Sequence, residues 1–537
     1  MKTLKTTFNT QVLKTNDIQV EFLKTGDIFK IASSHNQINL LQGNMVDGQF
    51  SNLYLRKKTD EGYIFERLLG IHSNAVFSIQ NDKAVYQGIA LGVSYQVVFS
   101  LFNNLWHYDV TLEKTEGMYD LIYGQDVGIA SYGSILSSEG YTAQYIDHKA
   151  FKNDLGYTVC SRQNQGQPHF LQIGSLNETM SYSTDGFQFF GLSYKQTSVP
   201  EILSKDMLKN YNYQYEFPYI ALQIKPFLLD ENKTFTFYGL YVESHEDVTK
   251  EALIVPTFEI FDALIDLEKP YKQPLLINPN NQLQINSVDE TYFGDEVKRH
   301  KEYKDETLLS FFKDNHKHVI LLQKELLVER PHGHLLVHGD LLNATEQVMA
   351  TTNFMYGVFN SHIVLGNTNF HKLTGDVRNF LNVTKVSGQR MYVDVNGSYQ
   401  LLGLPSYYEL GINYAKWVYV TNQDEIIVTV FAGFNQTQQR TTFESKNNIK
   451  YNILVTNQVT MNTNEYEIPL SYDITNDMLR VDVSSNPMVV QHYETLKYLF
   501  HAKDASIELA DDTFGFDESN SLFVFKYEGK SSFTIDV

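Results

Sequence analysis

The segment RMYVDVNGSYQLLG, residues 390–403, shows the pattern that most restricts the fold of this chain. Apolar side chains alternate with polar ones through Met391, Val393 and Val395, as in a strand with one buried face. The strand then stops at Asn396-Gly397, a pair that tolerates the positive φ angles of a type I′ turn. The segment therefore predicts a β-hairpin.

This pattern recurs along the chain. Residues 95–113 predict two strands around Asn103-Asn104, and residues 522–537 predict a hairpin around Glu528-Gly529. The 35 Tyr and 35 Phe residues also favour a pleated sheet, while helical periodicity is scarce. We therefore predict a mostly-β protein with two large antiparallel β-sandwich domains.

The clearest break in the pattern lies between the two predicted sandwiches. Residues 245–269 carry apolar side chains at helical spacing, and a Pro/Asn-rich loop and a charged stretch at 294–317 follow. Charge runs of this kind are usually solvated faces or short helices. We assign residues 1–245 to the first β-sandwich domain, 246–320 to a partly helical connector with loops, and 321–537 to the second β-sandwich domain.

Composition excludes several classes of partner. The net charge of −20, with no Lys/Arg stripe, argues against nucleic acid binding. The sequence contains no run of about 18 apolar residues, so we predict no membrane-spanning helix. The amino terminus lacks the apolar stretch of a secretory signal. The single cysteine, Cys160, suits a reducing cytoplasm, where we expect the protein to act.

The segment ERPHGHLLVHGD, residues 329–340, holds three histidines. On an extended segment His332, His334 and His338 share one face, and two of them could bind zinc with a third ligand from elsewhere. His338, however, lies roughly 13 Å from His334 along a strand. We therefore favour a domain joint, in which the imidazoles hydrogen-bond to backbone and carboxylates, and predict no metal.

Two stretches of the first domain offer polar groups. Arg162, Gln163 and Asn164 follow Cys160, and such planar donors and acceptors suit sugar hydroxyls. A polar loop that satisfies its own turn is the simpler interpretation. Asp185 precedes Gly186, and we predict a turn there before an aromatic strand, although Asp185 could also bind a sugar.

A catalytic motif is not evident. The sequence has no nucleophile elbow, P-loop or dinucleotide fingerprint. Hydrolytic glycosidases need two carboxylates at a set separation, and nothing pairs any two of the available ones, which are Asp126, Asp147, Asp185, Glu329 and Asp340.

Longer strings resemble the inverting glycoside phosphorylases of glycoside hydrolase family 94, in particular the 1,2-β-oligoglucan phosphorylases. The strings are ERLLGIHSNAVFS, LIYGQDVGIA, YTAQYIDHKAF, YTVCSRQNQGQPHF and TDGFQFFGLSYK in the first domain, and LLSFFKDNHKHVILLQKELLVERPHGHLLVHGD, FMYGVFNSHIVLGNTNF and KVSGQRMYVDVNGSYQLLGLPSYYELGINYAKWVY in the second. The resemblance implies supersandwich domains and cleavage of a β-glucosidic bond by inorganic phosphate, which is the co-substrate, with no other cofactor.

The same resemblance implies that the catalytic residues are not in this chain. The family's general acid and its phosphate-binding residues belong to an (α/α) barrel that follows the sandwich region, and this sequence predicts no such barrel. We therefore carry over no catalytic residue. The residues that we regard as substrate-binding or domain-interface candidates are Arg162, Gln163, Asn164, Asp185, His332, His334 and Arg390.

Three hypotheses follow. The first is a non-catalytic β-sandwich portion whose partner is the catalytic (α/α)-barrel half or subunit, with an exposed apolar surface that leads to self-association. The second is a stand-alone carbohydrate-binding protein that holds a β-glucooligosaccharide. The third, which we rank last, is an independent hydrolase that uses two of the carboxylates named above.

Overall fold

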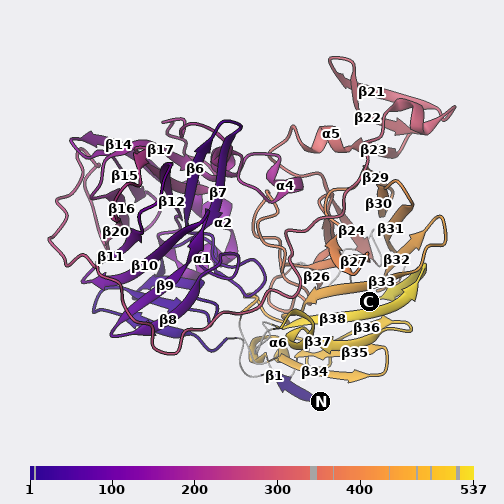
Figure 1. The fold of residues 1–537 in the computed structure, drawn as a ribbon. Coiled ribbons are helices and arrows are strands. Elements are labelled where there is room, and N and C mark those ends of the chain that lie inside the picture. The colour runs from indigo at the N-terminus through magenta and orange to yellow at the C-terminus, as the bar shows by residue number, and fades with distance from the viewer. Residues whose placement is uncertain are drawn as a thin grey trace. The chain divides into compact units, whose positions relative to one another are not determined.

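A computed structural model of the chain describes residues 1–4, 8–338, 348–366, 368–433, 436–466, 470–483, 486–515 and 521–537. Strands predominate in these residues and the helices are short (Figure 1), which confirms the mostly-β prediction. The chain divides into two compact units. Unit 1 comprises Met1–Phe8, Leu192–Ser198 and Leu276–Val537, and unit 2 comprises Asn9–Gly191 and Val199–Leu275.

Unit 2, whose residues are all described, contains three antiparallel sheets. The 8-stranded sheet has the order β14-β15-β16-β20-β11-β10-β9-β8. Its strands are β8 (Val76–Gln80), β9 (Lys83–Ala90), β10 (Val93–Phe102), β11 (Leu105–Leu112), β14 (Ile146–Asn153), β15 (Gly156–Gln163), β16 (Phe170–Ser175) and β20 (Lys233–Val242).

The other two sheets of unit 2 are smaller. One has the order β17-β18-β12-β6-β7 with β19 beside β12, and the other has the order β13-β5-β4-β3-β2. Their strands are β2 (Gln11–Lys14), β3 (Gln19–Phe22), β4 (Ile28–Ser33), β5 (Asn36–Gln37), β6 (Asn52–Thr59), β7 (Gly62–Arg67), β12 (Met118–Asp126), β13 (Ala130–Ser131), β17 (Thr179–Asp185), β18 (Pro218–Ile224) and β19 (Phe227–Leu228). Short helices lie at α1 (Tyr132–Ser137), α2 (Glu139–Ala143), α3 (Gly186–Phe190) and η1 (Glu201–Ser204).

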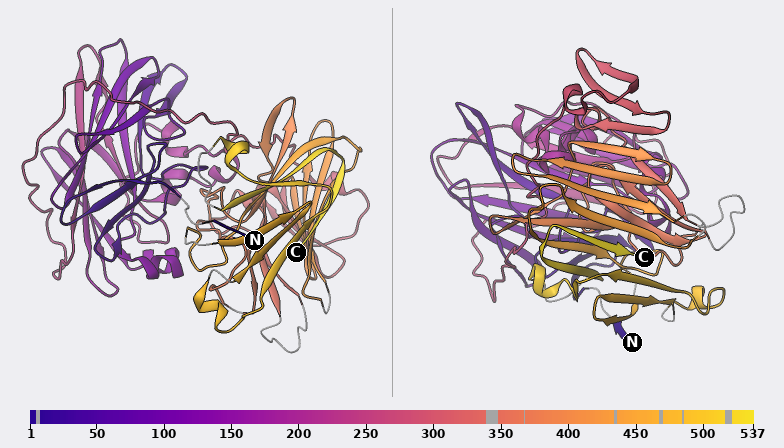
Figure 2. Two further views of the ribbon diagram at one scale, coloured as in Figure 1. Left: turned by 90° about the horizontal axis from the view of Figure 1, so that it is seen from below. Right: turned by 90° about the vertical axis from the view of Figure 1, so that its right-hand side faces the viewer.

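The described residues of unit 1 form two larger antiparallel sheets, seen face-on in part in Figure 2. The 12-stranded sheet has the order β1-β34-β35-β36-β39-β32-β31-β30-β29-β23-β22-β21. Its strands are β1 (Lys2–Leu4), β21 (Lys298–Lys304), β22 (Thr307–Lys313), β23 (Lys317–Leu321), β29 (Tyr407–Gly411), β30 (Tyr414–Val420), β31 (Glu425–Ala432), β32 (Gln439–Ser445), β34 (Leu470–Thr475), β35 (Met478–Asp482), β36 (Lys497–Ala502) and β39 (Ser532–Asp536).

The second sheet of unit 1 has the order β24-β25-β26-β27-β33-β38-β37, with β28 beside β27. Its strands are β24 (Gly333–His338), β25 (Met349–Phe354), β26 (Val358–Leu365), β27 (Gln389–Val395), β28 (Ser398–Leu401), β33 (Tyr451–Gln458), β37 (Ser506–Leu509) and β38 (Leu522–Lys530). Short helices lie at α4 (Tyr194–Thr197), η2 (Glu290–Phe293), α5 (Leu322–Glu325), α6 (Pro487–Val490) and α7 (Asp511–Phe514).

Each unit has its own apolar core. In unit 2 the core includes Trp106 and Tyr108 of β11, both fully buried. In unit 1 it includes Trp417 and Tyr408, whose rings lie 4.9 Å apart, together with side chains of the second sheet such as Phe525. Each unit therefore buries side chains from more than one sheet, as a sandwich does.

Two predicted hairpins are confirmed. Asn103 has φ 53° and joins β10 to β11, where Phe102 pairs with Leu105. Asn396 and Gly397 have φ 55° and 81° and join β27 to β28. Both central residues of this second turn lie in the left-handed region that a type I′ turn requires.

The predicted hairpin at Glu528-Gly529 is wrong. β38 continues through these residues and pairs with β33 and β37, whereas β39 pairs with β32 and β36 in the other sheet. Gly529, with φ 58°, lies opposite a shift in register on β33, and its N–H donates to Asn452. The glycine marks a β-bulge, which a sequence signals with the same residue as a turn.

The helix predicted from the periodicity of residues 245–269 is absent, and we correct that part of the connector. All of these residues are described, and they form an extended coil within unit 2. The charged stretch at 294–317 is likewise not helical, because it forms the exposed strand β21 and its partner β22 in unit 1.

Candidate functional site

The extended coil of His245–Glu268, which we call the strap, crosses one face of the 8-stranded sheet in unit 2. Side chains on seven of the eight strands bond to its backbone, in an order that follows the sheet from β14 and β15 to β8. The strap is thus held by side chains, since it pairs with none of these strands as a further strand would.

Glutamine side chains make the most regular of these contacts. The amide of Gln172 donates to the carbonyl of Leu253 at 3.1 Å and accepts from its N–H at 2.7 Å. Gln96 and Gln80 each donate to the carbonyl of one strap residue and accept from the N–H two residues further along, within residues 263–268 and at 2.7–2.9 Å. A primary amide can bond to backbone N–H and C=O groups as a neighbouring strand does, so these groups of the strap are hydrogen-bonded although the strap pairs with no strand.

The predicted sugar ligand Arg162 belongs to this set of contacts. Its Nε donates to the carbonyl of His245 at 2.8 Å and its Nη2 to that of Glu246 at 2.9 Å. Its Nη1 also bonds to Asn164 Oδ1. The guanidinium therefore anchors the beginning of the strap.

Gln163 and Asn164, the other two polar residues of the predicted site, differ in their surroundings. Gln163 is buried, and its Oε1 accepts from the N–H groups of Asn164 and Gln165 at 3.0 and 3.1 Å. This is the self-satisfied turn that the simpler interpretation of the sequence predicts. Asn164 is exposed at the surface.

Apolar contacts hold the middle of the strap. Leu253, Val255 and Phe258 pack against a small buried cluster of Leu105, Tyr238 and Leu240. The ring of Phe258 also stacks on buried His107, with centroids 4.4 Å apart. The helical spacing in the sequence reflects these sheet contacts rather than one face of a helix.

The predicted turn at Asp185 before an aromatic strand is wrong, because a short helix follows this residue. Its Oδ2 accepts from Gln188 N–H at 3.0 Å and so caps the short helix α3. Asp is a preferred N-cap because its carboxylate satisfies an N–H group that the helix leaves unpaired. Cys160 of β15 is also buried, and burial raises the pKa of its thiol to about 12, so it is not a nucleophile at neutral pH.

In unit 1 the histidines of the PHGH segment, residues 331–334, and of the strand that follows it have separate partners. His332 Nδ1 lies 2.6 Å from Glu325 Oε2, which also accepts from the His332 N–H at 3.0 Å. On its other side Glu325 pairs with Lys195 Nζ at 3.2 Å, and both of these side chains are fully buried. Burial lowers the pKa of Lys195, an effect that the negative charge of Glu325 opposes.

The other two histidines bond to backbone carbonyls. His334 Nε2 lies 3.0 Å from the carbonyl of Gly411, and His338 Nδ1 bonds to that of Gln438. Burial lowers the pKa of His338 and keeps its ring neutral. Within the described ranges no cluster of three or more His, Cys, Asp or Glu residues could hold a metal ion.

Arg390 is a third internal anchor. Its buried guanidinium donates to the carbonyls of Ser387 and Thr384, both at 2.9 Å, and to Asn382 Oδ1 at 2.7 Å. It therefore holds the loop that precedes β27.

The carboxylates considered for hydrolysis lie on different elements: Asp126 ends β12, Asp147 lies in β14 opposite Arg162, and Asp185 caps α3. Asp126 is buried and accepts from the N–H groups of Leu40 and Leu41 at 2.8 and 2.7 Å. Burial raises its pKa to about 6 although these bonds oppose the rise. Glu329 is exposed in the other unit, and Asp340 lies outside the described residues.

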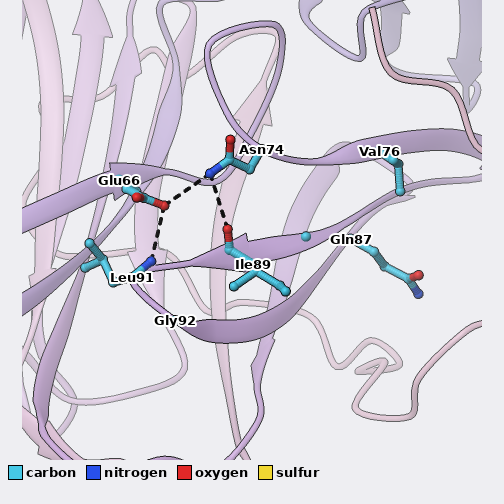
Figure 3. Close-up of a pocket in the computed structure, with 8 residues that line it drawn as sticks. Glu66, Asn74, Val76, Gln87, Ile89, Leu91 and Gly92 are labelled. Carbon is cyan, nitrogen blue, oxygen red and sulfur yellow. Dashed lines mark hydrogen bonds between the residues drawn. The ribbon is translucent and has the colours of Figure 1, made fainter.

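An open pocket of about 700 Å³ borders the strap in unit 2 (Figure 3). Glu66, Asn74 and Gln87 supply its polar groups, and Ile89 and Leu91 are among its apolar ones. Gln87 also donates to the carbonyl of Ile265 at 2.6 Å, so it belongs to both the pocket and the strap contacts.

Sequence reasoning missed the residues that carry the strap and the buried ion pair. The missed residues are Gln80, Gln87, Gln96, Gln172, Lys195 and Glu325. For the glutamines the signal is a single amide inside an otherwise apolar strand, as in YQVVFS and FLQIGS, whereas Lys195 and Glu325 carry no local signal. No helix among the described residues is long and apolar enough to cross a membrane.

Comparisons with known proteins agree with the resemblance seen in the sequence. The family model for the SOGP N-terminal domain matches residues 21–239, and that for the glycoside phosphorylase supersandwich domain matches residues 296–537. The 1,2-beta-oligoglucan phosphorylase of Listeria innocua serovar 6a is 30% identical over 550 residues, which cover 97% of this chain. This chain spans about half of that relative's length, since the match covers 48% of it.

Solved structures are more distant. A bacterial glucoamylase complexed with acarbose has a TM-score of 0.31 and 11% identity, over 45% of this chain and 34% of that one. A galactose mutarotase related enzyme from Lactobacillus acidophilus has a TM-score of 0.27 and 10% identity, over 45% of this chain and 100% of that one. Similarities this low do not assign a fold or a function to this chain.

The first family model matches mostly residues of unit 2, the second matches residues of unit 1, and the relative's match runs through both units. The chain therefore belongs to the glycoside phosphorylase family of which 1,2-β-oligoglucan phosphorylase is a member.

Proposed function

We propose that this chain is the non-catalytic β-sandwich portion of a 1,2-β-oligoglucan phosphorylase. One observation carries the proposal: a relative of that name matches 97% of this chain with only 48% of its own length. In the complete enzyme a phosphate oxygen would attack the anomeric carbon of the terminal glucose. The glycosidic C–O bond would break, and a general acid would protonate the leaving oxygen to give α-glucose 1-phosphate and the shortened glucan.

The internal use of polar side chains supports a scaffold role. A general acid has to reach the leaving oxygen of the substrate within hydrogen-bonding distance. Arg162, Glu325 and Arg390 instead hold backbone or a buried cation inside their units. We expect the catalytic groups on the (α/α)-barrel half or subunit, with the PHGH segment supporting a surface that meets it.

Co-expression tests this assignment. If a reading frame downstream of this chain encodes a helical-barrel polypeptide, the two should purify together and release glucose 1-phosphate from sophorooligosaccharides only when phosphate is present. A barrel polypeptide that neither associates with the chain nor gains activity from it would contradict the proposal. Without the barrel we expect the chain to self-associate, and a monomer in sedimentation at high concentration would contradict that expectation.

A second function, a stand-alone carbohydrate-binding protein in the cytoplasm, is favoured by the open pocket of unit 2. A carboxylate and two amides beside aliphatic side chains suit sugar hydroxyls and the apolar face of a sugar ring. Calorimetry of the isolated chain with sophorooligosaccharides should show binding in this case. Absence of heat at millimolar ligand would dismiss this function.

A further inference from the structure

The face beneath the strap is unusually polar for the buried side of a sheet. It presents the amides of Gln172, Gln96 and Gln87, and between them the carboxylate of Asp109 beside His107, whose Nδ1 lies 3.2 Å away. Strand spacing places such groups roughly 5 Å apart from one strand to the next. The face is therefore a row of donors and acceptors that runs across the strands.

This row matches the chemistry of a sugar chain as well as that of a peptide. Each amide offers a donor and an acceptor in one plane, which is what adjacent sugar hydroxyls need. To the strap these groups bond only through its backbone N–H and C=O, so these hydrogen bonds require no particular strap side chain. Within the face Gln87 Nε2 also donates to Gln96 Oε1 at 2.9 Å, and Gln172 Nε2 donates to the Tyr238 hydroxyl at 3.3 Å. An extended ligand rich in hydroxyls could replace the strap's peptide groups one for one.

The pocket of Figure 3 gives this face an open end. Its wall contains Gln87, the same residue that donates to the strap at Ile265. Glu66 accepts there from Asn74 Nδ2 and from Leu91 N–H, at 3.4 and 3.2 Å, and Ile89 is 60% exposed beside it. A ligand seated in this pocket would meet the edge of the strap.

We propose that this face of the 8-stranded sheet is a second binding surface for β-linked glucose chains, which the strap occupies as a built-in competitor. The glucan would enter at the pocket and displace the strap towards Gln96 and Gln172. The substrate class rests on the proposed function. A neutral ligand fits the middle of the face because the carboxylate there, Asp109, keeps two partners without the strap: His107 Nδ1 lies 3.2 Å away, and Thr236 Oγ1 donates to Asp109 at 2.7 Å.

The strap can be weakened without changing the face. Phe258 stacks on His107 and Phe261 lies over the same ring, so the double variant Phe258→Ser/Phe261→Ser removes the strap's own anchors and leaves every glutamine in place. Ile254→Ser is the matched control, because Ile254 lies on the same strap but is 95% exposed. Hydrogen exchange at the amides of Leu253 and Ile265 reports whether the strap is released.

Calorimetry with sophorotetraose measures the competition. We expect the double variant to exchange faster at both amides and to bind the glucan at least tenfold more tightly than the wild type and Ile254→Ser. Adding Gln96→Ala to the double variant should return the affinity to the wild-type value. If the double variant loses its cooperative thermal transition, Phe258→Ala takes its place.

Three results would overturn the proposal. One is faster strap exchange with an affinity within twofold of the wild type. Another is tighter binding that Gln96→Ala does not reverse. The third is that no variant frees the strap amides of a folded chain, because the strap would then be a permanent layer of the unit. Neither hydrogen exchange nor calorimetry depends on phosphorolysis. A failure of the proposed function would instead appear in the co-expression assay, so the two outcomes can be told apart.

Discussion

The strap contacts of unit 2 and the PHGH segment of unit 1 fix irregular backbone by different means. The strap is held mainly by neutral amides that pair with peptide groups, as Gln172 does with Leu253. The PHGH segment is held by a buried charge pair, in which Glu325 joins Lys195 to His332. A neutral amide costs little to bury when it is paired, whereas a buried ion depends on its partner. The two regions should therefore respond very differently to the loss of one group.

The largest effect is expected when the charged region loses its acid. Glu325→Ala leaves the Lys195 ammonium buried without this counter-charge and removes the acceptor of His332, so unit 1 should lose about 3–5 kcal/mol of unfolding free energy. Urea unfolding followed by Trp417 fluorescence, in a Trp106→Phe background, measures the change.

Its matched control removes an exposed acid. Glu296 of unit 1 pairs with Lys313 at 2.8 Å and its side chain is 52% exposed, so Glu296→Ala should cost less than about 1 kcal/mol. Equal losses for the two variants would remove the distinction between the regions.

The pH dependence of the unfolding free energy gives a second comparison, because the 8-stranded sheet of unit 2 holds a buried histidine in its neutral form. Burial lowers the pKa of His148 to about 3, and Ser161 Oγ lies 2.8 Å from its Nδ1. Since an unfolded histidine takes up its proton near pH 6.5, this group favours the folded state above that pH and loses that contribution as the pH falls.

His148→Asn should abolish this slope. Between pH 6.5 and 5 the wild type should lose about 2 kcal/mol more unfolding free energy than the variant, at about 1.4 kcal/mol per pH unit for one group. Parallel pH profiles from pH 7 to 4 would show that His148 is protonated equally in both states.

A smaller loss is expected from one amide of the strap contacts. Gln172→Leu leaves the N–H and C=O of Leu253 without their partner, and half-buried peptide groups of this kind should cost about 1–2 kcal/mol. Faster hydrogen exchange at Leu253, with unchanged exchange in unit 1, locates the effect. A loss as large as that of Glu325→Ala would contradict the ordering of the two regions.

The smallest effect is expected where neither amides nor charges act. Gly397 has φ 81° in the β27–β28 turn, and a methyl group there would meet open space. Gly397→Ala should therefore cost about 1 kcal/mol from backbone conformation alone. Thermal unfolding against Gly166→Ala, a second open glycine with φ 74°, tests whether the cost belongs to conformation at both sites.

The sequence predicted what depends on local alternation. Strand pairs with a two-residue turn, such as the one at Asn396-Gly397, were visible because the turn residues and the alternation agree. The bulge at Gly529 was not visible, since its glycine serves the same backbone need as a turn. The strap was mistaken for a helix because its apolar residues follow the packing of the sheet below it.

The roles of the candidate residues were predicted only in part. Arg162 was considered as a sugar ligand, yet its guanidinium donates to the carbonyl of His245. His332, in contrast, bonds to the carboxylate of Glu325, and hydrogen bonds of this kind to backbone and carboxylates were the favoured interpretation of its segment. Lys195 and Glu325 are 130 positions apart in the sequence, and no local pattern links them. Long-range pairing of this kind follows from the fold and is not written into any one segment.

The most direct test of the scaffold assignment uses the purified chain alone with sophorooligosaccharides and inorganic phosphate. We predict that no glucose 1-phosphate forms, because the proposed function assigns the proton donor for the leaving oxygen to another polypeptide segment. Phosphate-dependent release of glucose 1-phosphate by this chain, abolished by substituting one of its own carboxylates, would contradict that assignment.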